Sequence, residues 1–181
     1  MDSLIGYCSR NMATVTSLQL MTDTVLAQPL DATSFRRFGD VIEVQPKPSM
    51  IINEGNCSRY HDVARLDFVD ARAGISVFQA DPYVIPHRLR MVERHPLGSQ
   101  AFLPFSDEPF LVIVAEDDEG VPQTPLAFLS NGQQGVNYHR NTWHGVLTPL
   151  AGSGLFAVVD RIGEGDNLQE HWFDTPWRVV L

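Results

Sequence analysis

The sequence predicts a mainly all-β domain in which short strands close into a barrel or pack as two sheets. Short segments rich in Val, Ile, Phe and Leu recur along the chain, separated by Gly, Pro, Asn or Asp. Its 12 prolines and 13 glycines are spread throughout and so leave little room for long helices. Regular spacing of short strands and turns is typical of all-β sandwiches and barrels.

The first predicted element is a short helix in LDATSFRRFGD (30–40). Asp31 or Thr33 can cap its N-terminus, Phe35 and Phe38 fall on one face, and Gly39 ends it. The expected fold class is therefore mainly all-β with one or two short helices.

The strands are predicted by β-branched and aromatic residues between turn signals. FLVIVA (110–115) and LFAVVD (155–160) lack alternation, which predicts burial on both faces. AEDDEGVP (115–122) is expected to form an acidic hairpin or loop. The predicted strands are 39–44, 74–80, 90–95, 99–105, 109–115, 125–130, 134–139, 144–150 and 155–162.

The domain organisation is expected to be simple. A chain of 181 residues suits one domain, which we place at residues 21–181. Residues 1–20 are interpreted as a poorly ordered extension. The C-terminal HWFDTPWRVVL (171–181) carries too much apolar area to hang free, so it is expected to pack on the barrel or on a second subunit.

Composition narrows the function. A net charge of −9 disfavours nucleic acid and anionic membrane surfaces as partners, and no apolar run reaches the ~18 residues of a membrane span. Cys8 and Cys57 are too few for a disulfide framework, which suits a cytoplasmic protein. The only lysine, Lys47, lies in a loop between two prolines, which disfavours Schiff-base catalysis and leaves anion recognition to arginine.

Two pairs of residues carry the candidate chemistry. Glu93 and His95 are two apart on a predicted strand and therefore point to one face, where they could bind a divalent ion together. Taken alone, such a pair is more often a surface pair or a hydrogen-bonded core histidine. His139 and His144 are five apart, which on one regular strand sends them to opposite faces.

A turn at Arg140-Asn141 removes that difficulty, because asparagine tolerates the left-handed backbone conformation that such turns need. His139 then ends one strand and His144 begins the next.

These spacings resemble the two motifs of cupin barrels. His-x-His-x4-Glu falls on Glu93, His95 and Gln100, and Pro-x-Gly-x-x-His falls on His139, Asn141 and His144. The resemblance implies a cupin-like barrel and a metal set of His95, His144, Glu93 and Gln100. Gln100 replaces a glutamate and is a weak ligand.

A narrower resemblance covers most of the chain. The fragments FGDVIE, RYHDVA, ERHPLGSQAF and NGQQGVNYHRNTWH run in order from 38 to 144, followed by VVDRIGEGDN, and resemble the ureidoglycolate lyases. The resemblance implies a cytoplasmic, homodimeric lyase of allantoin breakdown. Such an enzyme cleaves ureidoglycolate to glyoxylate and urea with a divalent metal, often nickel.

This reaction assigns expected roles to individual residues. Elimination needs a base for the hydroxyl proton and an acid for the leaving nitrogen, for which His139 and Glu93 are the catalytic candidates. The candidates for substrate binding are Arg94, Arg140, Arg59 and Tyr138. Arg94 points away from Glu93 on a regular strand, and Arg140 at a turn tip is often solvated.

Two alternatives stay open. One is another metal-dependent cupin enzyme acting on a small hydroxy or keto acid. The other is a non-catalytic cupin that binds a small acid.

Overall fold

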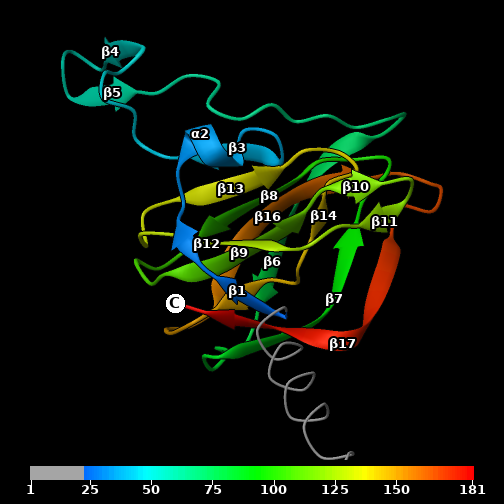
Figure 1. The fold of residues 1–181 in the computed structure, drawn as a ribbon. Helices are drawn as coiled ribbons and strands as arrows, with labels where there is room; N and C mark the ends of the chain where they lie inside the picture. The colour runs from blue at the N-terminus through cyan, green and yellow to red at the C-terminus, as the bar shows by residue number, and fades with distance from the viewer. Residues whose placement is uncertain (1–22) are drawn as a thin grey trace, which may run out of the picture.

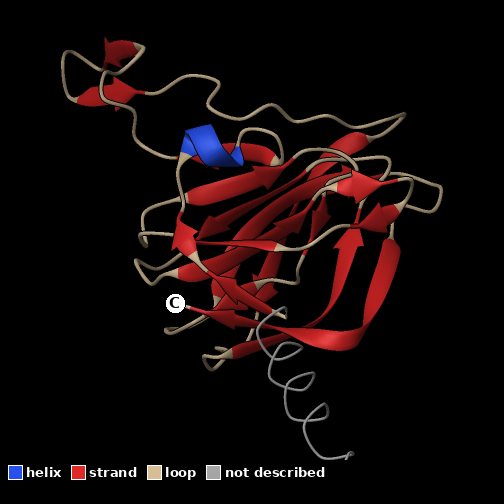
Figure 2. Cartoon of the chain, viewed as in Figure 1, coloured by secondary structure: helices blue, strands red, loops and turns tan. Residues whose placement is uncertain are grey.

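The computed structural model describes residues 23–181, so the extension predicted for residues 1–20 lies outside the described residues. Strands dominate this part of the chain (Figure 2), and α2 (Ala32–Phe35) is its one α-helix. The prediction of a mainly all-β, cupin-like barrel is confirmed. Among residues 23–181, no helix is long and apolar enough to cross a membrane.

Two large sheets form the body of the molecule (Figure 1). The eight-stranded sheet has the order β1 (Thr24–Leu26), β17 (Gln169–Val180), β7 (His87–Arg94), β14 (Trp143–His144), β9 (Phe110–Ala115), β12 (Leu126–Leu129) and β2 (Gln28–Pro29), with β15 (Thr148–Pro149) also pairing with β9. The five-stranded sheet has the order β3 (Gly39–Ile42), β13 (Gly135–Tyr138), β8 (Gln100–Pro104), β16 (Leu155–Ile162) and β6 (Arg72–Gln79). Two hairpins complete the fold, β4 (Met50–Ile52) with β5 (Cys57–Arg59) and β10 (Asp117–Asp118) with β11 (Val121–Pro122).

The core has two parts, one on each face of the eight-stranded sheet. Phe110, Val112 and Val114 of β9 pack between the two sheets, against residues such as Phe102 and Val158. The alternate residues of β9 face a second cluster that includes Leu89, Trp143 and Val179. All six residues of β9 are therefore buried, as its unbroken apolar run predicts.

The same prediction is wrong for β16. Phe156 and Val158 are buried, whereas Ala157 and Val159 remain partly exposed. The reason is that β16 belongs to the five-stranded sheet, whose outer face is incompletely covered by the described chain. Ile75 on the neighbouring β6 is 79% exposed on that face.

The helix forms where it is predicted but is shorter. Asp31 caps it and accepts hydrogen bonds from the backbone N–H groups of Thr33 and Ser34. Phe35 is fully buried, and β3 begins directly after Phe38. Gly39 is required at this point, because a Cβ there would lie 2.0 Å from the carbonyl oxygen of Asn137 on β13.

Two predicted turns are confirmed. The acidic segment forms the β10–β11 hairpin, with Glu119 and Gly120 at positive φ. The chain also turns at Arg140-Asn141, where Asn141 has φ 68° and the N–H of Thr142 donates to the carbonyl of His139. β13 ends before this turn and β14 follows it, and the predicted strand 144–150 is divided into β14 and β15.

The C-terminal tail forms the long strand β17, which pairs with β7 on one side and with β1 on the other. The prediction that this tail packs on the barrel is confirmed. By contrast, the β4–β5 hairpin stands away from the two sheets (Figure 1).

Candidate functional site

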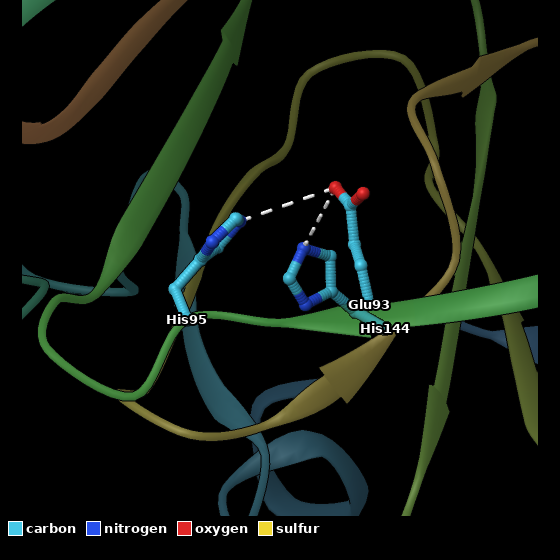
Figure 3. Close-up of side chains that lie close together, drawn as sticks. All are labelled: Glu93, His95 and His144. Carbon is cyan, nitrogen blue, oxygen red and sulfur yellow. Dashed lines mark ion pairs between the residues drawn. The ribbon is translucent and has the colours of Figure 1, made fainter. Parts of the chain in front are cut away.

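Glu93, His95 and His144 converge at one end of the space between the sheets (Figure 3). One ligand atom from each residue lies within 4.8 Å of the other two. Oε1 of Glu93 is 3.7 Å from Nε2 of His144 and 3.9 Å from Nε2 of His95. The second carboxylate oxygen of Glu93 points away from both rings (Figure 3).

Strand pairing places these three residues together. Glu93 on β7 is the direct cross-strand partner of His144 on β14. His95 follows the last residue of β7, and its carbonyl accepts the N–H of Asn141 from the turn before β14. The Arg140-Asn141 turn therefore anchors both histidines to the same end of the sheet.

Backbone carbonyls fix the orientation of both imidazole rings. Nδ1 of His144 lies 2.9 Å from the carbonyl oxygen of Thr142, and Nδ1 of His95 lies 2.7 Å from that of Asn167. A carbonyl only accepts, so each Nδ1 carries a proton and each Nε2 keeps its lone pair when the ring is neutral. Both Nε2 atoms are buried without a hydrogen-bond partner among residues 23–181.

The burial of the cluster changes its protonation. Burial, assisted by the neighbouring His95, lowers the pKa of His144 to about 3, so this ring is neutral at physiological pH. Burial raises the pKa of Glu93; Glu170 adds to the effect and His95 opposes it.

This set of donors fits a divalent transition metal. Two imidazole nitrogens and one carboxylate oxygen converge, and ions such as zinc, iron and nickel prefer these ligand types. The carbonyl groups behind each Nδ1 are the outer partners that metal-binding histidines ordinarily have. The buried and unpartnered Nε2 atoms are the observation on which this fit rests.

Two further predicted residues lie next to the cluster. The ring of Tyr138 stacks on His144 with a centroid distance of 4.2 Å and an interplanar angle of 18°. Burial, with a smaller effect of Glu93, raises the pKa of the Tyr138 hydroxyl well above its usual value. Gln100 pairs with Tyr138 across the sheet, and its buried Oε1 has no partner within the described range.

A cavity of about 250 Å³ adjoins His95. Asp160 reaches it from β16, and its buried Oδ1 has no hydrogen-bond partner in the part of the chain that the structure describes. Burial raises the pKa of Asp160, against the opposing effects of His95 and of a hydrogen bond from Ser76. The cavity is lined by His95, Ser99, Gln100, Asp160, Arg161, Asn167 and Leu168.

The structure does not bring His139 to this cavity. Asn137 and His139 lie on the opposite face of β13 from Tyr138, and Nε2 of His139 is 3.2 Å from Oδ1 of Asp40. Burial would raise the pKa of Asp40, but hydrogen bonds from Arg65, Asn137 and His139 hold it below its usual value. The predicted catalytic role of His139 stays a prediction, and this placement does not favour it.

The three predicted arginines also lie elsewhere. Arg94 faces the opposite side of the sheet from Glu93, with its guanidinium 4.3 Å from the ring centroid of Trp143 and 2.6 Å from Asp117. Arg140 is 3.4 Å from Asp67 at the turn. Arg59 lies on the β4–β5 hairpin, 3.0 Å from His61. Each of the three arginines thus has a partner away from the cavity. Their roles in substrate binding stay predictions, and these placements do not favour them.

Sequence reasoning missed two residues of the site. Asp160 interrupts the apolar strand LFAVVDRI with the same parity as Phe156 and Val158, and this charge on an inward face is a signal that could have identified it. Asn167 holds His95 through its carbonyl, and its side chain accepts the N–H of Leu97. Its place after a Gly-rich loop gives no such signal.

Comparison with known proteins identifies the family. A model of the ureidoglycolate lyase family matches residues 22–180. "Ureidoglycolate lyase" of Rhodobacter capsulatus is 55% identical over 158 residues, which are 87% of this chain and 98% of that protein. "Ureidoglycolate lyase 2" of Rhizobium meliloti is 51% identical, covering 84% of this chain and 94% of that protein. "Ureidoglycolate lyase" of Chelativorans sp. is 49% identical, covering 87% and 96%. This chain therefore belongs to the ureidoglycolate lyase family.

Proposed function

We propose that the protein cleaves ureidoglycolate to glyoxylate and urea at the cluster of Glu93, His95 and His144. The observation that carries this proposal is the convergence of two buried, unpartnered imidazole nitrogens and a carboxylate beside a cavity, within residues 23–181. The identity of the substrate is inferred from membership of the ureidoglycolate lyase family.

The reaction is an elimination at one carbon. This carbon carries a hydroxyl, a carboxylate and the urea nitrogen. Removal of the hydroxyl proton allows the C=O bond of glyoxylate to form while the C–N bond breaks. The electron pair of that bond goes to nitrogen, which takes up a proton and leaves as urea, so no oxidant or reductant is needed.

A divalent metal is the cofactor that this site would hold, through Nε2 of His95, Nε2 of His144 and a carboxylate oxygen of Glu93. Such an ion would polarise the hydroxyl oxygen and lower its pKa. Nickel is consistent with the imidazole and carboxylate donors, and the resemblance to the family suggests it. Gln100 is not assigned to the metal; it lines the cavity and is available to the substrate.

Glu93 is the proposed proton carrier. Its second carboxylate oxygen points away from both imidazole rings, so the proposed metal ligation leaves this oxygen to act as the base (Figure 3). The same carboxyl group can accept the hydroxyl proton and return it to the departing nitrogen. A second titrating residue is not required by this scheme.

Arg161, the residue after Asp160, carries a positive charge beside the cavity. Arg161 lines the cavity, and its guanidinium donates to the carbonyls of Val69 and Glu164. No carboxylate of residues 23–181 lies within ion-pair distance of it. On a regular strand the Arg161 side chain points to the opposite face from Asp160, so we propose no direct contact with the substrate, only a long-range attraction of the anion.

The test is release of urea and glyoxylate from ureidoglycolate by the purified protein. We expect release well above the spontaneous rate, and a loss of kcat of at least about a hundredfold in Glu93→Gln. Glu108→Gln, the same change at an exposed position before β9, is the matched control. Release at the spontaneous rate by the wild-type protein would refute the proposed function.

We further propose a cytoplasmic homodimer. The exposed Met50 and Ile51 on the β4–β5 hairpin and the exposed Ile75 and Val77 on β6 support a second copy as partner.

A further inference from the structure

We infer that Asp160 and Gln100 form a subsite that accepts the N–H groups of the substrate's ureido end. This inference deepens the proposed function and rests on it for the identity of the substrate. The subsite lies in the five-stranded sheet, facing His95 across the cavity.

Strand register places the two side chains next to each other. Phe156 and Val158 of β16 point into the core, so Asp160 points to the same face. Val159 pairs with Ala101 of β8, and the following pair in this antiparallel register is Asp160 with Gln100.

Tyr138 continues this row on the other side of Gln100, because β13 pairs with β8 at these two residues. The inner face of the sheet therefore ends in a polar row that runs from Tyr138 through Gln100 to Asp160. Glu93 and His144 lie in the opposite sheet, so the two halves of the site face each other.

The unmatched atoms in this row are both acceptors. Oδ1 of Asp160 and Oε1 of Gln100 are buried and have no hydrogen-bond partner among the described residues. Burying a polar atom without a partner is costly, so such atoms in a cavity indicate a ligand that supplies donors. A ureido group carries three N–H donors, whereas a carboxylate has none and would be repelled by Asp160.

This chemistry orients the substrate. The ureido end lies against Asp160 and Gln100, and the carbon that carries the hydroxyl lies toward Glu93. Ser76 hydrogen-bonds to Asp160 and helps to hold the carboxyl group in place. Asp160 is thus a substrate-binding residue, while Gln100 is assigned to the substrate instead of to the metal.

The test compares two ligands that lack the hydroxyl and so do not react. N-Carbamoylglycine has the ureido NH2, and N-acetylglycine carries a methyl group in its place. Isothermal titration of the protein as purified is expected to give a preference for N-carbamoylglycine of about tenfold or more, as expected of hydrogen bonds to a charged group. Asp160→Asn should reduce this preference to less than about threefold. Asp174→Asn, an identical change at an exposed site on β17, should keep it.

A second variant keeps the test decisive if Asp160→Asn does not fold. Gln100→Met removes the other acceptor at similar size and should weaken the preference while leaving the metal content unchanged. A full preference in both variants would overturn the subsite, as would a loss of metal in Gln100→Met.

These outcomes separate the two proposals. Wild-type protein that shows the ligand preference but does not cleave ureidoglycolate contradicts the proposed function alone. Wild-type protein that cleaves ureidoglycolate, with both Asp160→Asn and Gln100→Met retaining the full preference, contradicts the subsite alone.

Discussion

At the residue scale, His144 is the side chain on which the candidate site depends most. It is 2% exposed, pairs with Glu93 across the sheet, stacks on Tyr138 and is oriented by the carbonyl of Thr142. The stacking and the hydrogen bond hold the ring with Nε2 toward the carboxylate of Glu93 (Figure 3). A ligand held in this way loses little conformational entropy when it binds a metal.

Removal of this ring tests the metal site. His144→Ala is expected to weaken the binding of a divalent ion by at least about tenfold, because one of three strong ligands is lost. Elemental analysis of the purified protein and titration of the metal-free protein with Ni²⁺ measure this change. An unchanged affinity would show that the ion binds elsewhere.

His139→Ala is the matched histidine control. His139 pairs with Asp40 on the outer face of the five-stranded sheet, so the metal content should stay at the wild-type level. Its kcat should fall much less than that of Glu93→Gln. A loss of kcat equal to that of Glu93→Gln would instead support the acid–base role that the sequence predicts for His139.

His87 provides a pH-dependent contribution to stability away from the site. It is 6% exposed beside Tyr83, and burial lowers its pKa from 6.5. As the pH falls through 6.5, the unfolded chain binds a proton at His87 while the folded chain does not yet do so, and the stability therefore falls as the pH decreases.

We expect His87→Gln to make the free energy of unfolding less dependent on pH between about pH 7 and pH 5. Guanidinium titrations across this range measure the slope, with His61→Gln as the exposed control. An unchanged slope contradicts the prediction.

The sequence predicts those parts of the site whose residues lie close together in the chain. Glu93 lies on β7 and His95 directly follows its last residue, and the period of two of an extended chain suffices to place them on one face. The placement of the arginines that the sequence predicts to bind substrate could not be foreseen in this way, because their partners are far away in sequence. Arg94, for example, pairs with Asp117, and the sequence does not reveal that β10 lies next to β7.

At the element scale, the Arg140-Asn141 turn joins the fold to the site. Its N–H at Asn141 donates to the carbonyl of His95, while β14 begins two residues later with Trp143 and His144. A change in this turn therefore displaces both histidines. The left-handed conformation of Asn141 is the feature that a substitution can disturb.

Asn141→Val should destabilise the protein by about 1–2 kcal/mol, because a β-branched residue is strained at positive φ. It should also weaken metal binding through the displaced histidines. Asn141→Gly, which accepts this conformation, is the control and should change neither property appreciably. Chemical denaturation and Ni²⁺ titration measure the two effects. Equal stability of the two variants would contradict this account.

The elements themselves could be predicted where they are regular. Apolar strands such as β9 and β16 occupy almost the ranges that the sequence predicts. β17 is not predicted as a strand, because Asp174 and Pro176 interrupt its apolar pattern. The structure accommodates them by a shift in register between Trp172 and Trp177. Such a bulge depends on the neighbouring strand, which a local pattern does not contain.

At the scale of the whole molecule, the β4–β5 hairpin is the element that the proposed dimer would stabilise. Each of its strands has three residues, and an isolated hairpin of this size is marginally stable in water. Ile51, which is 62% exposed, is placed to be covered by a second copy of the chain.

Sedimentation of the protein should therefore give twice the chain mass of 20.2 kDa. Ile51→Asp should shift the equilibrium toward the monomer, since it places a charge in the proposed interface. Val84→Asp, at a loop position that is 82% exposed, is the control. A wild-type monomer would contradict the proposed dimer, and a dimer unaffected by Ile51→Asp would exclude the hairpin from its interface.

The pairing of β1 with β17 has a consequence for how the protein is made. Thr24 lies opposite Arg178, so the first and last strands of the described chain are parallel neighbours in one sheet. During synthesis, β1 cannot pair with β17 until almost the whole polypeptide has left the ribosome. Contacts between such distant segments form slowly. Glu93 and His144 likewise meet only after about fifty further residues have been added, so a metal at the proposed site would bind the folded chain and not its early nascent segments.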